Sequence, residues 1–259
     1  MQKMKTSAAV VLFAMIVISS ASAQEEEAKP DKNWSNEAEL SLVNTSGNSE
    51  TINFAGKNLL KINFTDTLQG EWDISALKSE NTDKTTDRRE TAAERYSTNL
   101  KLSYLFTERF YTGVGGGWLR DEFAGLTNKY YIGPFAGYKF LAGPKHVFIG
   151  ELGLNYASED YTAEKEIENF EDKNFWEGRL FGLYEYVITD KTNLSQSLEY
   201  LYDFDDSENY KVNSLSAVTV SLSDVISIKT SYEVRYSNQV PVDLETTDRV
   251  LTVGLLANL

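Results

Sequence analysis

The sequence predicts one all-β domain, a single antiparallel up-and-down β-barrel of about twelve strands that is able to cross a membrane. Three observations support this fold class. Apolar and polar residues alternate along segments of about ten to sixteen residues. Short and long connections alternate between these segments, and aromatic residues gather near the segment ends.

The N-terminal segment predicts export. Two lysines precede an apolar run at residues 8–18, which is too short to span a bilayer as a helix. Small residues at Ala21 and Ala23 fit a signal-peptidase site, so a cleaved signal peptide is expected at 1–23, with Gln24 as the first mature residue. A helix packed on a core would need an amphipathic stripe, whereas this run is apolar all round.

Composition excludes several functions. The chain has no cysteine, so a lipid-anchored cysteine, a disulfide framework and a thiolate metal site are all excluded. Its formal net charge of −14 disfavours nucleic acid as a partner. Residues 24–32 are acidic and predict a disordered periplasmic tail, and residues 33–259 contain the barrel.

Each predicted strand is longer than the five or six residues usual in a soluble β-sandwich and meets the roughly nine to eleven that a tilted strand needs to cross a bilayer. The expected strands are 33–44, 52–64, 68–78, 92–106, 110–121, 128–141, 146–157, 174–187, 192–203, 210–222, 226–238 and 248–259. Pro134 lies within the sixth segment, where it cannot donate a ladder hydrogen bond, so we expect a bend or a shifted boundary there.

The connections predict the orientation of the barrel. Tight turns follow the even-numbered segments, at 65–67, 107–109, 142–145, 188–191 and 223–225. Longer connections follow odd-numbered segments, at 79–91, 158–172, 204–209 and 239–247, although 45–48 is a short exception. Short turns are typical of the periplasmic rim, so both ends of the chain should lie on that side.

The polar faces predict an ion-paired lumen. Folding each hairpin about its turn places opposite charges near one another. The expected pairs are Glu37 with Lys57, Lys61 with Glu71, Asp73 with Arg95, Arg179 with Glu199, Asp203 with Lys211, and Arg235 with Asp248. Because neither sign dominates this face, it lacks the single-sign rings typical of an ion-selective pore.

Two other features carry weaker hypotheses. The acidic loop 158–172 is either a solvated surface or a weak site for divalent cations. The second feature is a group of glycines on the predicted inner face: Gly113, Gly115, Gly117, Gly133, Gly137 and Gly153. This glycine wall, which lacks side chains, either leaves a groove for a solute or lets the sheet curve and admits long side chains.

No catalytic constellation is evident. His146 is the only histidine and lies at a predicted turn, with no serine placed beside it to form a hydrolytic triad. The sequence also lacks a phosphate-binding glycine-rich loop, a zinc-binding cluster and a dinucleotide fingerprint. We therefore expect neither enzymatic activity nor a metal or other cofactor.

The opening hairpin resembles that of the family of salt-induced outer-membrane proteins, a domain of unknown function. The resemblance lies in Trp34 to Leu42, then Thr45-Ser46-Gly47-Asn48, then the alternating strand from Thr51. It implies an outer-membrane barrel and transfers no catalytic residue. Outer-membrane lipids and the barrel assembly machinery are the expected partners of a monomer.

Two functions follow from this prediction, and a third remains open. The barrel would serve envelope integrity or the response to salt and osmotic stress, or it would give slow passive passage to small solutes. A plugged lumen favours the first function and continuous water in the lumen favours the second. A soluble secreted β-sandwich that binds a ligand is the remaining alternative.

Overall fold

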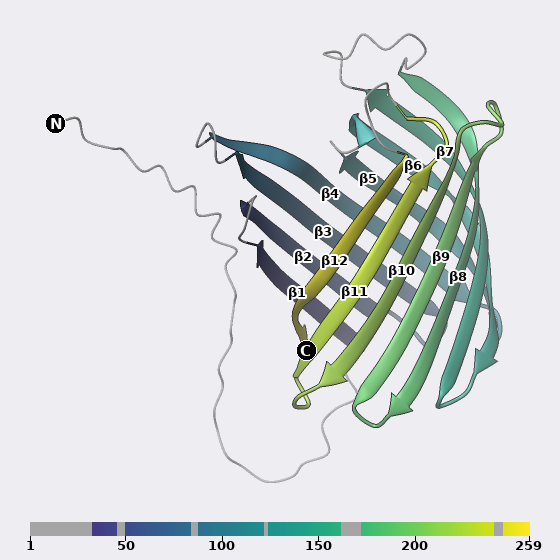
Figure 1. Ribbon diagram of the computed structural model, residues 1–259. Helices are drawn as coiled ribbons and strands as arrows, with labels where there is room; N and C mark the ends of the chain where they lie inside the picture. The colour runs from purple at the N-terminus through teal and green to yellow at the C-terminus, as the bar shows by residue number, and fades with distance from the viewer. Residues whose placement is uncertain (1–32, 46–49, 84–87, 122–123, 162–171, 241–245) are drawn as a thin grey trace. The chain divides into compact units, whose positions relative to one another are not determined.

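The computed structural model describes residues 33–45, 50–83, 88–121, 124–161, 172–240 and 246–259. They form one closed antiparallel barrel in which each strand pairs with its neighbours in sequence and β12 pairs with β1 (Figure 1). The predicted fold class is therefore confirmed. The expected signal peptide and acidic tail lie outside the described residues. Among the residues described, no helix is long and apolar enough to cross a membrane.

The strands follow the predicted segments closely. They are β1 (Trp34–Thr45), β2 (Glu50–Asn63), β3 (Leu68–Asp83), β4 (Arg88–Leu105), β5 (Phe110–Asp121), β6 (Leu126–Ala142), β7 (His146–Tyr161), β8 (Lys173–Thr189), β9 (Thr192–Asp203), β10 (Tyr210–Ser221), β11 (Ile226–Ser237) and β12 (Thr247–Asn258).

The main difference lies between β3 and β4. The expected loop 79–91 is mostly strand, because β3 continues to Asp83 and β4 begins at Arg88. Residues 79–83 are all polar, so alternation is lost although the backbone ladder continues. Alternation of apolar and polar residues reveals a strand only where one face of the strand is apolar. The predicted strand therefore ended at residue 78, before the end of β3.

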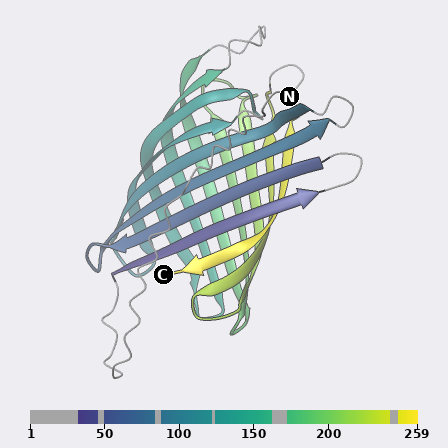
Figure 2. The ribbon, with the colours of Figure 1, turned by 90° about the vertical axis from the view of Figure 1, so that its left-hand side faces the viewer.

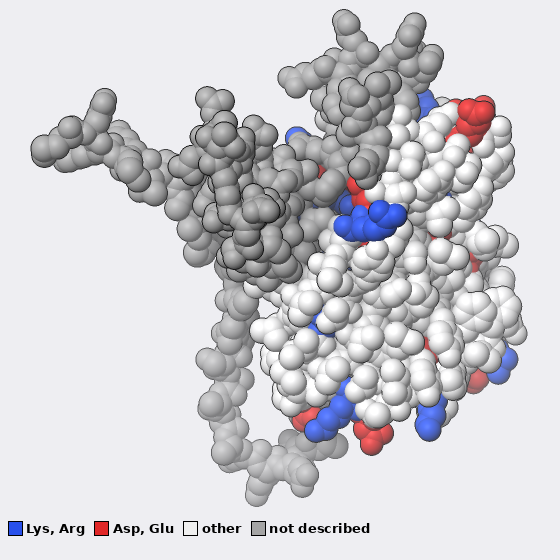
Figure 3. Space-filling model, in the orientation of Figure 1, with Lys and Arg blue, Asp and Glu red and all other residues white. Residues whose placement is uncertain are grey.

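The two faces of the wall have opposite chemistry. Large apolar side chains point outward, as Ile132 and Leu152 do with 61% and 65% of their surfaces exposed. The buried side chains that point inward include Glu151, Glu159 and Arg235. Figure 3 shows an outer wall that is mostly uncharged, with Lys, Arg, Asp and Glu mainly near its upper and lower edges. An apolar outside around a polar inside is the arrangement of a membrane barrel.

Short turns at one rim share a local device. The hydroxyl oxygen of Thr65 accepts a hydrogen bond from the amide of Leu68 at 2.9 Å. Thr107 accepts one from the amide of Phe110 in the same way, at 2.8 Å. A side-chain oxygen at the start of each turn thus satisfies a backbone donor that has left the ladder, which explains the sequence preference for Thr there.

Aromatic side chains occur near both rims, as the sequence predicted. At the short-turn rim, the ring centroids of Tyr138 and Phe140 lie 5.2 Å apart. Near the other rim, Tyr210 lies 6.0 Å from both Tyr200 and Tyr236. These amphipathic rings occupy the positions at which a membrane barrel meets the two interfaces of a bilayer.

Candidate functional site: the charged lumen

The structure brings several of the sequence-predicted ion-pair residues together. Lys61 lies directly opposite Glu71 in the register of β2 and β3. Arg235 lies opposite Asp248, with Nη2 and Oδ2 4.0 Å apart. Arg179 reaches Glu199 on β9, where its Nε lies 2.6 Å from Oε1.

The expected pairing of Glu37 with Lys57 is wrong. Glu37 lies opposite Leu59, and Glu39 lies opposite Lys57. The hairpin is centred one residue later than its sequence turn suggests, and this shift moves every opposing residue by two. The alternation of faces survives such a shift, but the identity of the partners does not.

The other two expected pairs find different partners. Asp73 lies opposite Asn99, whose amide donates a hydrogen bond to it at 3.0 Å. Asp203 pairs with Lys173 at 3.2 Å, and Lys211 pairs with Glu159 at 2.5 Å. Arg95, expected beside Asp73, instead pairs elsewhere in the lumen. Long lysine and arginine side chains reach past adjacent strands, so hairpin folding alone does not identify their partners.

Four side chains form a bridge across the lumen, which we call the lumenal bridge: Arg95 on β4, Asp121 on β5, and Glu233 and Arg235 on β11. Arg95 lies 3.3 Å from Asp121 and 3.1 Å from Glu233. Arg235 lies 3.1 Å from Asp121 and 3.9 Å from Glu233. Positive and negative groups therefore alternate around a four-membered ring.

Strand order shows that this ring crosses the barrel. β5 and β11 are separated by six steps in either direction around the closed sheet, so they stand on opposite walls. Arg235 and Asp121 are nearly buried, with 7% of each side chain exposed, although they project into the lumen. Removing one member of such a buried pair leaves a charge without compensation.

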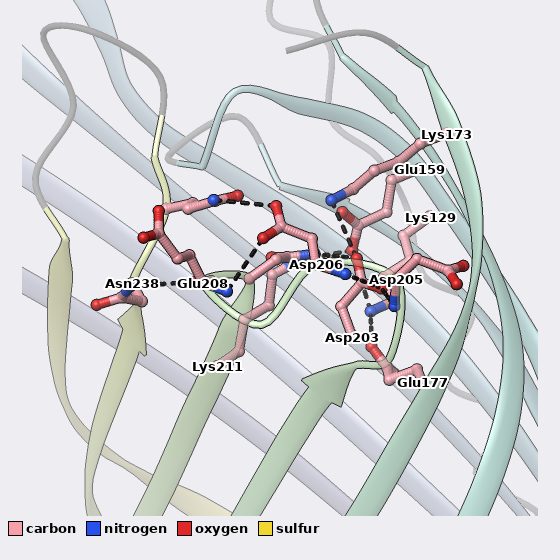
Figure 4. Close-up of polar contacts among 12 residues, drawn as sticks. Lys129, Glu159, Lys173, Glu177, Asp203, Asp205, Asp206, Glu208, Lys211 and Asn238 are labelled. Carbon is pink, nitrogen blue, oxygen red and sulfur yellow. Dashed lines mark hydrogen bonds and ion pairs between the residues drawn. The ribbon is translucent and has the colours of Figure 1, made fainter. Parts of the chain in front are cut away.

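A second cluster, the wall network, lies inside β6 to β10 towards the long-loop rim (Figure 4). Lys129 contacts Glu159 at 3.1 Å and Glu177 at 2.5 Å. Glu159 also forms an ion pair with Lys211, so one fully buried carboxylate contacts two ammonium groups. With the Lys173–Asp203 pair, three bases meet three acids, and the network is electrically neutral.

A third cluster centres on Glu151, deep in the barrel. It accepts hydrogen bonds from Lys101 at 2.7 Å, from Arg179 at 2.9 Å and from the hydroxyl of Tyr111 at 2.8 Å. All of these partners point into the lumen from β4, β5 and β8. The Glu151 carboxylate therefore has three hydrogen-bond donors and needs no water to satisfy it. The four side chains together fill this level of the lumen.

Aromatic rings occupy part of the space beside the inward-facing glycines of the glycine wall. A Cβ added at Gly137 would lie 2.2 Å from the ring of Tyr111, and one at Gly113 would lie 2.7 Å from the ring of Phe135. These rings belong to neighbouring strands, not to the opposite wall. At these two positions the space is therefore occupied by protein, which supports the space-filling interpretation over an open groove there.

Pro134 stays within β6, opposite Val114 of β5. The register with β7 passes from Ile132 to Phe135 and omits Gly133 and Pro134. The ladder is thus interrupted where proline lacks a donor, without ending the strand.

The remaining sequence hypotheses have mixed outcomes. Most of the acidic loop lies outside the described residues, and within the described ones no group of three potential metal ligands occurs. Nδ1 of His146 lies 2.9 Å from the hydroxyl of Tyr184, and its ring stacks on Tyr186 at 4.7 Å. These contacts place the histidine in an aromatic group at the short-turn rim.

Sequence reasoning missed the residues that close the lumen. Glu151, Asp121 and Glu233 each pair with a base on a strand that is not adjacent, namely Lys101, Arg235 and Arg95. Their inward positions followed from alternation, so the side they face was predictable. The β4–β5 hairpin register does place Arg95 opposite Asp121. The contacts with strands that are not adjacent depend on barrel closure, and no hairpin register contains that information.

An apolar outer wall, a polar inner face and short turns at one rim together define the class of outer-membrane-type β-barrels. The chain belongs to the family described as "Protein of unknown function, DUF481", whose model matches residues 38–259.

A curated relative and two solved barrel structures are similar to the chain. The uncharacterized protein YdiY of Escherichia coli strain K12 is 26% identical over 176 residues, covering 68% of this chain and 66% of that protein. An outer-membrane channel from Pseudomonas putida F1 has a similar fold, with a TM-score of 0.51 and 11% identity over 93% of this chain and all of that chain. The NanC porin matches with a TM-score of 0.48 and 7% identity, over 86% and 97% of the respective chains.

Proposed function

We propose that this protein resides in the outer membrane as a barrel closed by ion pairs and that it supports the envelope instead of acting as an open pore. The lumenal bridge is the observation that carries the proposal, because Arg235 and Asp121 meet across the lumen at 3.1 Å. The neutral wall network adds a second filled level. The resemblance of the opening hairpin adds the expectation that salt or osmotic stress increases the need for this role.

A narrow channel for small solutes is the second candidate function. Arg95 and Glu233 in the lumenal bridge keep 21% and 25% of their side-chain surfaces exposed, so water reaches the bridge. A rearrangement of these two side chains would open a passage without unfolding the wall. The two candidates differ in whether water is continuous through the lumen.

Two measurements test the proposal. Membrane fractionation should find the mature protein with the outer membrane, as a form whose gel mobility changes on heating. Planar-bilayer recording of that heat-modifiable form should give no discrete conductance steps. Steps from wild-type protein would favour the channel, and a protein that remains soluble after export would contradict both membrane functions.

A further inference from the structure

Three neighbouring strands carry polar side chains on the outer wall of the barrel. We call these residues the outer polar patch: Gln196 of β9, Ser214 and Ser216 of β10, and Thr230 of β11. They face outward because Glu199, Ala217 and Arg235, each an odd number of residues away on the same strands, point into the lumen. Figure 1 shows the three strands side by side.

The outer polar patch lies at membrane depth. Ser214 and Ser216 occupy the middle of β10, between Tyr210 near the long-loop rim and the short turn at 223–225. Nearby on the same face, Leu198 and Val218 have 53% and 39% of their surfaces exposed, as lipid-facing residues would. Lipid offers no hydrogen bonds at this depth, so polar side chains there need partners in protein.

Hydrogen bonds within the patch use only part of its capacity. The Gln196 amide donates to Ser214 Oγ at 3.0 Å and to the carbonyl of Ser197 at 2.8 Å, and the hydroxyl of Ser216 donates to Gln196 Oε1. Within the described residues, the hydroxyl hydrogen of Ser214, the lone pairs of Ser216 and the hydroxyl of Thr230 meet no further partner. The patch therefore keeps an unused donor beside an unused acceptor.

Another outward polar pair, on a different part of the wall, is closed on itself. The amides of Asn36 and Asn58 exchange hydrogen bonds of 3.0 and 3.1 Å between β1 and β2. Figure 2 shows β1, in purple, on the wall that faces the viewer, and β11 and β12 separate it from β10. Because each amide serves the other, this pair provides a control for polarity alone.

The shape of β10 suits a flat contact. Its outward residues between Tyr210 and Leu222 are no larger than valine: Val212, Ser214, Ser216, Val218 and Val220. Small residues let transmembrane segments approach closely, and Ser and Gln side chains hydrogen-bond across such contacts. Two copies in the same membrane orientation are related by a two-fold axis along the membrane normal, so one surface meets the same surface of the other copy.

We propose that the outer polar patch is the contact through which two copies of this chain associate in the membrane, with β10 against β10. The unused hydroxyl hydrogen of Ser214 in each copy donates to an oxygen of Ser216 or Gln196 in the other. The contact rests on the proposed residence in the outer membrane, and a dimer takes the place of the monomer expected from the sequence. It leaves the lumenal bridge untouched, so it does not depend on whether the lumen conducts.

Energy transfer between labelled copies tests the contact. The chain has no cysteine, so Asp224→Cys places one dye in the exposed turn after β10, outside the patch. Glu108→Cys places the dye in the turn after β4, on the opposite wall, because β4 and β10 are six steps apart in the closed sheet. Donor-labelled and acceptor-labelled barrels are mixed in dioleoyl phosphatidylcholine vesicles after heat modifiability has shown that each is folded.

Transfer in the Asp224→Cys protein should persist as the lipid-to-protein ratio is raised and should exceed transfer in the Glu108→Cys protein. Adding Gln196→Leu, Ser214→Ala and Ser216→Ala should reduce transfer to the level of random proximity, because no donor or acceptor is left to share. Adding Asn36→Leu with Asn58→Leu is the matched control, since it removes an outward polar pair elsewhere, and should leave transfer unchanged.

Transfer that falls with lipid dilution to the same extent with and without the patch substitutions would overturn the dimer. Higher transfer from the Glu108→Cys position would also overturn a contact through β10. Loss of heat modifiability in the Asp224→Cys protein and the unlabelled wild type would contradict membrane residence and the contact together, whereas a folded, inserted barrel that does not associate overturns the contact alone.

Discussion

Lys229 Nζ lies 2.7 Å from Glu39 Oε2, so this ion pair joins β11 to β1 across the intervening strand β12. It lies beside the seam at which β1 pairs with β12, where Glu39 is opposite Leu256. Backbone pairing at this seam is short, so a side-chain link that skips a strand adds to closure of the barrel.

Lys229→Met should weaken that closure. Glu39 is almost fully buried and would lose the ammonium group that lies 2.7 Å from it, a loss of about 3 kcal/mol for a buried pair. We expect a lower urea midpoint for loss of the heat-modifiable form. Lys61→Met is the control, because Lys61 lies opposite Glu71 of the adjacent strand and its position skips no strand. Equal losses in the two variants would contradict a special role for the Lys229 link.

The lumenal bridge predicts the effect of a charge exchange. Arg235→Asp should place a fourth acid beside Asp121, Glu233 and Asp248 and open a conducting path, seen as discrete steps in a planar bilayer. Adding Asp121→Arg restores an opposite-charge pair across the lumen and should silence those steps. Continued conductance of the double variant, with its heat-modifiable mobility intact, would show that this pair does not close the lumen.

Gly133 and Gly153 form a matched pair of inward glycines. A Cβ at Gly133 would lie 2.0 Å from the backbone oxygen of Leu154, which cannot move without disturbing the sheet, whereas one at Gly153 meets its nearest atom at 3.5 Å. Gly133→Ala should therefore cost about 1 to 3 kcal/mol in urea unfolding, and Gly153→Ala should cost less than about 1 kcal/mol. The reverse order of stability would refute the close packing of β6 against β7.

The hydroxyl and the ring of Tyr111 should contribute separately to the free energy of unfolding. Tyr111→Phe removes one donor to Glu151 and keeps the ring over Gly137, for a loss of about 1 kcal/mol. Tyr111→Ala also uncovers that glycine and should cost about 3 kcal/mol or more. Urea unfolding monitored by gel mobility compares the two; similar losses would mean that the ring contributes little.

The wall was predictable from the sequence, and the contents of the lumen were predictable only in part. Alternation placed Arg179 and Glu199 on the inner face, because side-chain direction in a strand is a local property. Pairs such as Arg95 with Glu233 depend on how far the closed sheet curves, which no local pattern encodes. The polar extension of β3 was missed because its ladder persists after the apolar face has ended.

The alternating ring of Arg95, Asp121, Arg235 and Glu233 also determines how the lumen acts on an approaching ion. Two positive and two negative groups arranged in turn behave as a quadrupole, whose potential falls with distance much faster than that of a single charge. The ring itself would therefore exert almost no long-range attraction or repulsion on an ion entering from either rim. Discrimination at this level would therefore depend on size and direct contact, not on the sign of the charge.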